Sequence, residues 1–241
     1  MMAYPHKFMR WLAGLIFPYR CLGCRIYLEN SYLCKKCFNA LPIRKQMECI
    51  GCRRMTPSGQ TCPFCKDEYL IDRLMIVSDF NDPILSTLIK SMKYKYISEI
   101  SKPLHQLTRK YLTHVASHKH ISLVADTPLI VPVPLHKHRE HERGFNQAEL
   151  LAQQLASGFQ LEMTAALNRM RYGKHQADIE DRETRILNAK NSNYEASRAI
   201  NNRNILLIDD VCTTGATLNE CARVLKNAGA RSVTALVIAR G

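Results

Sequence analysis

The sequence predicts an α/β protein, with a parallel sheet flanked by helices, preceded by a small cysteine-rich module. Short apolar runs alternate with segments of helical periodicity over residues 67–241, a pattern that favours parallel strands joined through helices. Eight of the ten cysteines lie between residues 21 and 65, which sets that segment apart. We therefore expect an apolar helix over 1–20, a cysteine module over 21–66 and an α/β domain over 67–241.

The N-terminal segment has some features of an export signal. Lys7 and Arg10 flank the start of a short apolar run at 11–17, but Pro18, Tyr19 and Arg20 make a poor cleavage site. An amphipathic helix that packs on the protein is the favoured interpretation. The sequence contains no run of about 20 apolar residues, the length a membrane-spanning helix needs. We expect a cytoplasmic protein without a transmembrane segment.

The chain is strongly basic. Its 34 Lys and Arg residues against 21 Asp and Glu give a formal net charge of +13. Such an excess attracts polyanions, so nucleic acids, nucleotides and phosphorylated substrates are candidate partners. The alternative is a solvated positive surface without a ligand.

The eight clustered cysteines form four C-x-x-C pairs, with nine residues between the pairs of each half. Two such pairs can complete a tetrahedral four-sulfur zinc site. Gly23 and Gly51 precede the second cysteine of a pair, where a knuckle tolerates positive φ. The two halves predict a tandem repeat of one zinc ribbon. The candidate metal ligands are Cys21, Cys24, Cys34, Cys37, Cys49, Cys52, Cys62 and Cys65.

Other uses of these cysteines are less favoured. A disulfide framework suits a small secreted scaffold, whereas a large domain follows here. Iron–sulfur ligation also uses cysteines, but paired x₂ spacings repeated twice favour structural zinc. Sequential pairing is simplest, while interleaved pairing, or loss of the ion in one half, stays open. Cys212 and Cys221 stand apart.

The α/β segment has recognisable element signals. Asp82 and Pro83 mark a helix start, Asn146 and Glu149 form a capping box, and Gly229 marks a helix end. A basic loop is expected after residue 134, and the polar stretch 168–202 lacks a clear period. We expect strands at 73–78, 129–133, 205–208 and 232–238, and helices at 84–92, 97–117, 146–156 and 217–228.

The most informative segment is I-L-L-I-D-D-V-C-T-T-G-A-T at 205–217. Its apolar strand delivers Asp209 and Asp210 to the carboxyl end of the sheet, where open α/β sheets bind ligands. The acids suit ribose hydroxyls and a hydrated Mg²⁺, and the turn at 213–217 suits a phosphate at a helix N-terminus. Gly215 lets the backbone approach that phosphate. An ordinary turn capped by Thr213 or Thr214 would leave the paired acids unexplained.

The string D-D-V-C-T-T-G-A-T resembles the 5-phosphoribosyl-1-pyrophosphate (PRPP) motif of type I phosphoribosyltransferases. With V-P-V-P-L-H at 131–136, R-G-F-N-Q-A at 143–148 and the cysteine pairs, essentially the whole chain resembles the ComF family, competence-associated proteins related to GntX. The resemblance implies a type I phosphoribosyltransferase-like fold behind a double zinc ribbon. The PRPP-binding residues it implies are Asp209, Asp210, Val211, Cys212, Thr213, Thr214, Gly215, Ala216 and Thr217, with Mg²⁺ accompanying PRPP.

The resemblance also implies a pyrophosphate side. Arg139 and Arg143 are the expected donors, because the planar guanidinium binds phosphate oxygens bidentately. Lys174 falls where such transferases carry a closing loop; the alternative for these bases is a solvated cationic surface. One position departs from purine-salvage members: Thr213 stands where they have an acid that exchanges a proton with the base. This argues against purine salvage and leaves other acceptors open.

A basic, aromatic segment follows the first predicted strand. Lysines can neutralise phosphates while a tyrosine stacks on a base, although an amphipathic helix with a wet basic face is the alternative. The candidate nucleic-acid contacts are Lys90, Lys93, Tyr94 and Lys95.

The resemblance thus predicts a PRPP-binding, zinc-containing competence protein that assists uptake and processing of single-stranded DNA in natural transformation. A DNA-translocating helicase or a recombination protein is the expected partner. Two alternatives stay open: an active phosphoribosyltransferase on an unidentified small acceptor, and a PRPP sensor that gates a partner.

Overall fold

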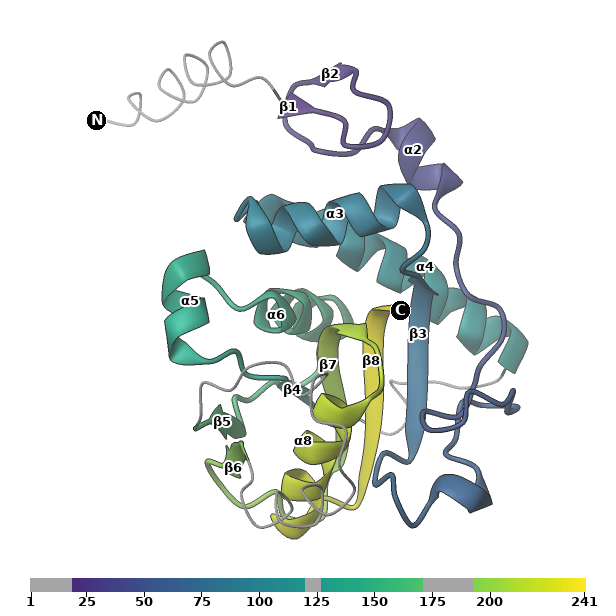
Figure 1. The fold of residues 1–241 in the computed structure, drawn as a ribbon, viewed down its shortest axis with the longest axis vertical. Coiled ribbons are helices and arrows are strands. Elements are labelled where there is room, and N and C mark those ends of the chain that lie inside the picture. Colours follow the sequence, from purple (N-terminus) through teal and green to yellow (C-terminus); the bar gives the residue numbers. More distant parts are fainter. Residues whose placement is uncertain (1–18, 120–126, 171–192) are drawn as a thin grey trace, which may run out of the picture.

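The computed structural model describes residues 19–119, 127–170 and 193–241. At its centre is a four-stranded sheet in the order β3-β8-β7-β4, in which all neighbouring strands run parallel (Figure 1). The parallel α/β architecture predicted from the sequence is confirmed. The strands are β3 (Arg73–Asp79), β4 (Leu129–Pro132), β7 (Asn204–Cys212) and β8 (Ser232–Arg240).

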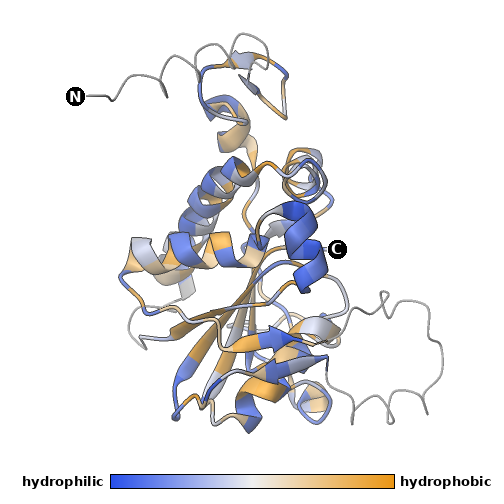
Figure 2. Cartoon of the chain, turned by 90° about the vertical axis from the view of Figure 1, so that its left-hand side faces the viewer, coloured by the Kyte–Doolittle hydropathy of each residue, from blue (hydrophilic) through white to orange (hydrophobic). Residues whose placement is uncertain are grey.

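Helices cover both faces of this sheet. Helices α3 (Pro83–Tyr94), α4 (Ser101–Lys119) and α6 (Gln147–Phe159) pack on one face, and α8 (Ala216–Asn227) packs on the other. Because successive side chains of a strand point to opposite faces, Leu206 and Ile208 join the core of the three helices, while Ile205 and Leu207 join the core of α8. Figure 2 shows the strands mostly hydrophobic and the helices mixed.

The two halves of the cysteine module join different cores. The first half contains β1 (Tyr19–Arg20), β2 (Tyr27–Leu28) and α2 (Lys35–Ala40), and its buried cysteines belong to the core of α3, α4 and α6. The second half contains the 3₁₀ helix η1 (Pro63–Cys65); Ile50 and Ile71, which flank it, belong to the core of α8. The tandem repeat is therefore divided between the two faces of the sheet.

Several local signals form as expected. Asp82 is the N-cap of α3, where its Oδ1 accepts a hydrogen bond from the Leu85 N–H at 2.8 Å. Gly229, with φ of 95°, follows the end of α8. The capping box at Asn146 is half formed: its side chain caps α6, but Glu149 accepts from Gln153 instead.

The structure also differs from the expected elements. The basic loop after residue 134 contains a helix, α5 (Lys137–Arg143), capped by His136 and ended by Gly144 with φ of 73°. The polar stretch contains an antiparallel pair, β5 (Leu167–Arg169) and β6 (Tyr194–Ala196). Another 3₁₀ turn, η2 (Ser98–Ile100), precedes α4, which starts later than predicted.

Two further expectations concern the membrane and the N-terminus. Over the described ranges, we find no helix that combines the length and apolar character needed to cross a membrane. The helix expected over 1–20 lies almost entirely outside the described residues.

Candidate functional site

The eight cysteines form two separate clusters with sequential pairing. Within each cluster the four Sγ atoms lie within 4.8 Å of one another. Tetrahedral zinc–sulfur bonds place sulfurs about 3.8 Å apart, and the Cys24–Cys34 and Cys52–Cys62 Sγ distances are 3.7 and 3.6 Å. A disulfide would need about 2.05 Å, and every cysteine is free. Both clusters can therefore hold a metal ion, and the disulfide and interleaved alternatives are excluded.

Backbone N–H groups donate hydrogen bonds to one cysteine sulfur in each cluster. The Cys34 N–H donates to Cys21 Sγ at 3.4 Å, and the Cys62 N–H donates to Cys49 Sγ at 3.3 Å. Burial raises the pKa of Cys21 and of Cys49. Hydrogen bonds from the Cys34 and Cys62 N–H groups and from other nearby N–H groups have the larger effect, so each pKa is lowered to about 6. A thiol that loses its proton near neutral pH is a ready metal ligand.

Gly23 and Gly51 do not adopt the positive φ that these positions would tolerate. Positive φ falls two residues later, on Arg25 (67°) and Arg53 (61°). The glycines are needed for space instead: a Cβ on Gly23 would lie 2.8 Å from Cys37 Sγ, and one on Gly51 would lie 2.9 Å from Cys65 Sγ. The repeat thus has the same backbone geometry in both halves.

The predicted phosphate turn is open. It connects β7 to α8, and Thr213, Thr214 and Thr217 are exposed along it. The N-cap of α8 is Gly215, with φ of 84°, rather than either threonine. Glycine has no side chain to cap the helix. The Thr214 hydroxyl accepts a hydrogen bond from the Ala216 N–H at 3.3 Å, and the N–H groups of the residues that follow, at the positive end of the helix dipole, favour an anion.

The two acids lie beside this turn but face opposite sides of the sheet, as strand alternation requires. Asp210 is buried, and its Oδ1 lies 2.8 Å from the Lys93 ammonium of α3. Asp209 Oδ1 accepts a hydrogen bond from the Asp210 N–H at 2.8 Å. Burial and the Asp210 charge raise the pKa of Asp209 to about 7, despite the opposing effect of Lys93. The site therefore contains one paired carboxylate and one that titrates near neutral pH.

The expected pyrophosphate donors lie on α5, which follows the neighbouring strand β4. The carboxyl ends of β4 and β7 are adjacent, with the Val133 N–H bonded to the Ile208 carbonyl at 2.9 Å. Arg143 donates to Gln147 Oε1 at 3.0 Å, and its guanidinium lies 6.0 Å from the centre of the Tyr94 ring. Arg139 is half-buried on the same helix. Lys174 lies outside the described residues.

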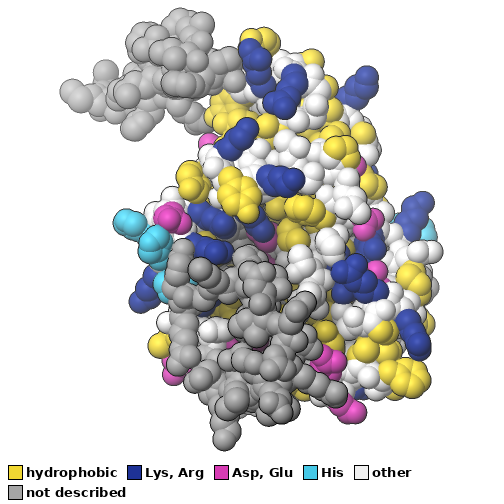
Figure 3. Space-filling view, viewed as in Figure 1, with side chains coloured by type: hydrophobic (Ala, Val, Ile, Leu, Met, Phe, Trp, Pro, Cys, Tyr) yellow, Lys and Arg dark blue, Asp and Glu magenta, His cyan; other side chains and the backbone are white. Residues whose placement is uncertain are grey.

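The four candidate nucleic-acid residues occupy α3 and its end, but they differ in their contacts. Tyr94 is 70% exposed, and Lys95 is exposed next to it. The Lys90 ammonium lies 5.8 Å from the centre of the Phe80 ring. Lys93 instead forms the ion pair with Asp210. Figure 3 shows Lys and Arg side chains gathered with histidines over the region of α3 and α5.

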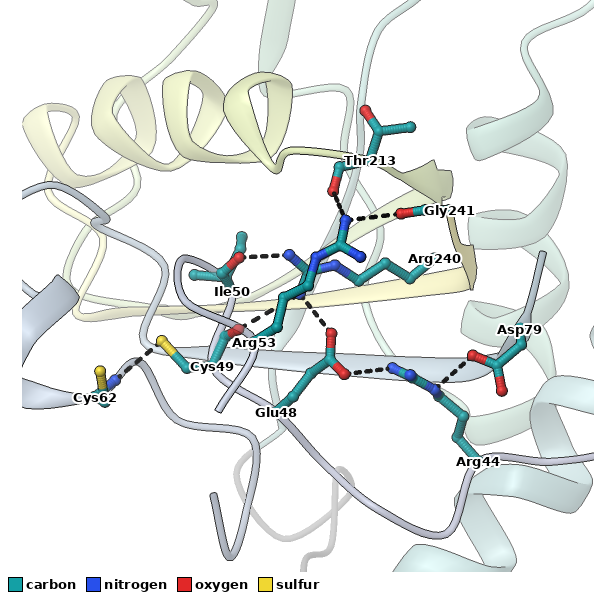
Figure 4. A network of polar contacts seen from close by, with 10 residues as sticks. All are labelled: Arg44, Glu48, Cys49, Ile50, Arg53, Cys62, Asp79, Thr213, Arg240 and Gly241. Carbon is teal, nitrogen blue, oxygen red and sulfur yellow. Dashed lines mark hydrogen bonds and ion pairs between the residues drawn. The ribbon is translucent and has the colours of Figure 1, made fainter. Parts of the chain in front are cut away.

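A buried network beside the site was not predicted. The Arg240 guanidinium at the end of β8 pairs with Glu48 at 2.8 Å and donates to the Ile50 carbonyl at 2.6 Å (Figure 4). Glu48 also pairs with Arg44 at 2.8 Å, and Arg44 pairs with Asp79 at 2.8 Å. The only sequence signal is a charged residue at the end of an apolar strand, and its partner lies 192 positions away.

A parallel sheet, paired acids at a strand end and an open turn into the next helix define a phosphoribosyltransferase-type domain. Residues 145–241 match the family model described as "Phosphoribosyl transferase domain".

Similarity to known proteins extends over nearly the whole chain. It is 30% identical to "Competence protein F" of Haemophilus influenzae, covering 93% of this chain and 98% of that protein. It is 31% identical to "DNA utilization protein YhgH" of Escherichia coli, covering 94% and 99%. Against "Competence protein ComFC" of Bacillus subtilis the identity is 29%, covering 94% and 97%. The chain belongs to the ComF family of competence proteins.

Proposed function

We propose that this protein binds PRPP with Mg²⁺ and assists the handling of single-stranded DNA in the cytoplasm during natural transformation. The observation that carries the proposal is the turn at 213–217 with its exposed threonines, which follows Asp209 and Asp210 at the end of β7. Relatives named for competence and for DNA utilization support the DNA half.

The charges suit a phosphorylated sugar with its cation. Lys93 neutralises Asp210, so the buried carboxylate does not repel an approaching phosphate. Asp209, with a pKa near 7, loses its proton readily when a cation approaches, and so suits Mg²⁺ bound through water. The hydroxyls of Thr213, Thr214 and Thr217 with the α8 N-terminus would receive the 5-phosphate. Arg139 and Arg143 would meet the pyrophosphate.

The cysteine clusters are proposed to hold structural zinc. Four sulfurs at tetrahedral spacing form a closed set typical of structural rather than catalytic zinc. Free thiols in every cysteine fit a reducing compartment such as the cytoplasm.

The exposed side of α3 and its end is proposed to contact single-stranded DNA. Tyr94 offers an exposed ring for base stacking, and Lys90 and Lys95 offer charge for phosphates. The formal charge of +13 adds long-range attraction. The protein partner expected from the resemblance is a helicase or a recombination protein that receives the strand.

Fluorescence anisotropy with a labelled oligothymidylate tests the DNA half. Affinity should fall steeply with salt, and Lys95→Ala should reduce the log–log salt slope by roughly 0.7. Tyr94→Ala should weaken binding by about 1–3 kcal/mol, whereas Tyr94→Phe should retain it. Lys110→Ala, at an exposed position of α4, is the matched control and should change little. DNA binding that is absent or independent of salt would contradict the proposed role in handling single-stranded DNA.

A second candidate function is transfer of phosphoribose to a small acceptor. Asp209 favours it, because a carboxyl with a pKa of about 7 can exchange a proton, which Thr213 cannot do near neutral pH. Pyrophosphate release from PRPP with a panel of nucleobases separates the two functions. Saturable PRPP binding without release for any acceptor would support the accessory role.

A further inference from the structure

The second cysteine cluster packs against the underside of the phosphate turn. Ile50, the residue after Cys49, is fully buried there. A Cβ built on Gly215 would lie 2.8 Å from Ile50 Cγ1. Ile50 therefore packs under the turn, while the residues Thr213, Thr214 and Thr217 stay exposed.

Arg53, the residue after Cys52, holds the beginning of the turn. Its Nη2 donates to the backbone oxygens of Thr213 at 3.4 Å and Gly241 at 2.9 Å (Figure 4). Because a trans peptide is planar, its carbonyl and its N–H point in opposite directions. Holding the Thr213 carbonyl toward the cluster therefore turns the Thr214 N–H away from it.

Other contacts fix the cluster on either side of the turn. Arg240 donates to the carbonyls of Cys49 and Ile50, at 3.4 and 2.6 Å. Asn219 in α8 donates to the Glu68 carbonyl at 2.8 Å and accepts from the Leu70 N–H at 2.7 Å. The cluster is thus attached to the strand before the C-terminus and to the helix that follows the turn.

The first cluster has no equivalent arrangement among the described residues. Arg25 matches Arg53 in position, in positive φ and in exposure, but within the described ranges we find no hydrogen bond made by its guanidinium. Leu22, the counterpart of Ile50, packs with the core of α3, α4 and α6. Only one of two equivalent units thus contacts the turn.

Resting on the PRPP binding proposed above, we propose that Ile50 and Arg53 are positioning residues of the phosphate turn. Metal binding at Cys49, Cys52, Cys62 and Cys65 then sets the affinity for phosphorylated ribose, and metal binding at the first cluster does not. If the cysteine module only packed against the sheet, the Arg53 guanidinium would have no need to donate a hydrogen bond to the Thr213 carbonyl.

Replacing each arginine by glycine tests the proposal. Both Arg53→Gly and Arg25→Gly relieve the positive φ, so neither should destabilise its knuckle backbone. Arg53→Gly should weaken PRPP binding about tenfold, the effect of losing two hydrogen bonds, while Arg25→Gly should leave it unchanged. Arg53→Lys should restore part of the affinity. Calorimetry on the metal-loaded full chain, with metal content measured, gives these values.

Amide hydrogen exchange gives a readout that needs no PRPP. The peptide covering 213–217 should exchange faster in Arg53→Gly, and in Cys52→Ser with one metal lost, than in Arg25→Gly or Cys24→Ser. Equal exchange and equal PRPP affinity in both members of each pair would overturn the inference. Absence of PRPP binding in the unaltered chain would instead overturn the proposed function, and the exchange rates would still decide the inference.

Discussion

The ammonium of Lys93 lies 2.8 Å from Oδ1 of Asp210, joining the last turn of α3 to the end of β7. The sequence predicts Lys93 as a nucleic-acid contact, together with its neighbours on α3. The ion pair connects it instead to Asp210, one of the two acids proposed to bind ribose. The proposed DNA surface and the proposed sugar site therefore share one helix, with Lys93 facing inward and Tyr94 outward.

Removing Lys93 should destabilise the fold. Asp210 is buried, so Lys93→Ala leaves a carboxylate without its partner, at a cost of about 2 kcal/mol in the free energy of unfolding. Urea unfolding measures this, and Lys90→Ala, at an exposed position of the same helix, should change it by less than about 0.5 kcal/mol. Adding Asp210→Asn should recover much of the loss; no recovery would show that the pair is not coupled.

Asp209→Asn should raise stability at neutral pH. The folded pKa of Asp209, about 7, exceeds its ordinary value of 3.8. The folded state therefore binds its proton more tightly, and stability falls as pH rises from about 4 to about 7. The asparagine variant should be more stable than the unaltered chain at pH 8, and the difference should vanish below about pH 4. Parallel pH profiles in thermal unfolding would contradict this assignment, and PRPP binding should be lost in either case.

Gly215→Ala should lower the stability of the protein by more than the cost of its positive φ alone. Its φ of 84° costs any other residue about 1–2 kcal/mol, and the added Cβ would also meet Ile50. Gly144, with φ of 73° and nothing within 4 Å of its Cβ position, is the matched control. Gly215→Ala should lose more stability than Gly144→Ala in chemical unfolding and bind PRPP more weakly. Equal losses would mean that Ile50 yields to the methyl group.

Glu48→Ala should be among the most destabilising single changes. It leaves the buried Arg240 guanidinium without its carboxylate, which costs about 3–5 kcal/mol. The exposed pair of Arg203 and Glu162, 3.0 Å apart, is the control, and Glu162→Ala should cost at most about 1 kcal/mol. Thermal unfolding of both variants makes the comparison; similar midpoints would show that the Arg240 network contributes little.

The local chemistry of this protein could be predicted from its sequence. Each cysteine pair, and the strand that runs into D-D-V-C-T-T-G-A-T, is defined by residues within a dozen positions. The structure confirms the sequential pairing of the cysteines and the strand–turn–helix order. Helix α5 was missed because K-H-R-E-H-E-R has no apolar periodicity. Its Glu140 in the first turn and Arg143 in the last favour a helix through the dipole instead.

Long-range placement could not be predicted. The two cysteine units are nearly identical in spacing, yet one joins the core of α3 and the other joins the core of α8. What separates them is Arg240 and Gly215, which lie far along the chain and, among the described residues, contact the second unit and not the first. The contact between Arg53 and the turn is therefore visible only in three dimensions.

Calorimetric titration of Mg²⁺–PRPP into the metal-loaded full chain tests the central claim most directly. The account predicts saturable binding at one site per chain, lost in Asp209→Ala/Asp210→Ala and retained in Lys110→Ala. Heat that never saturates, or an isotherm that the double substitution leaves unchanged in a folded chain, would contradict the assignment of this turn to a phosphorylated ribose.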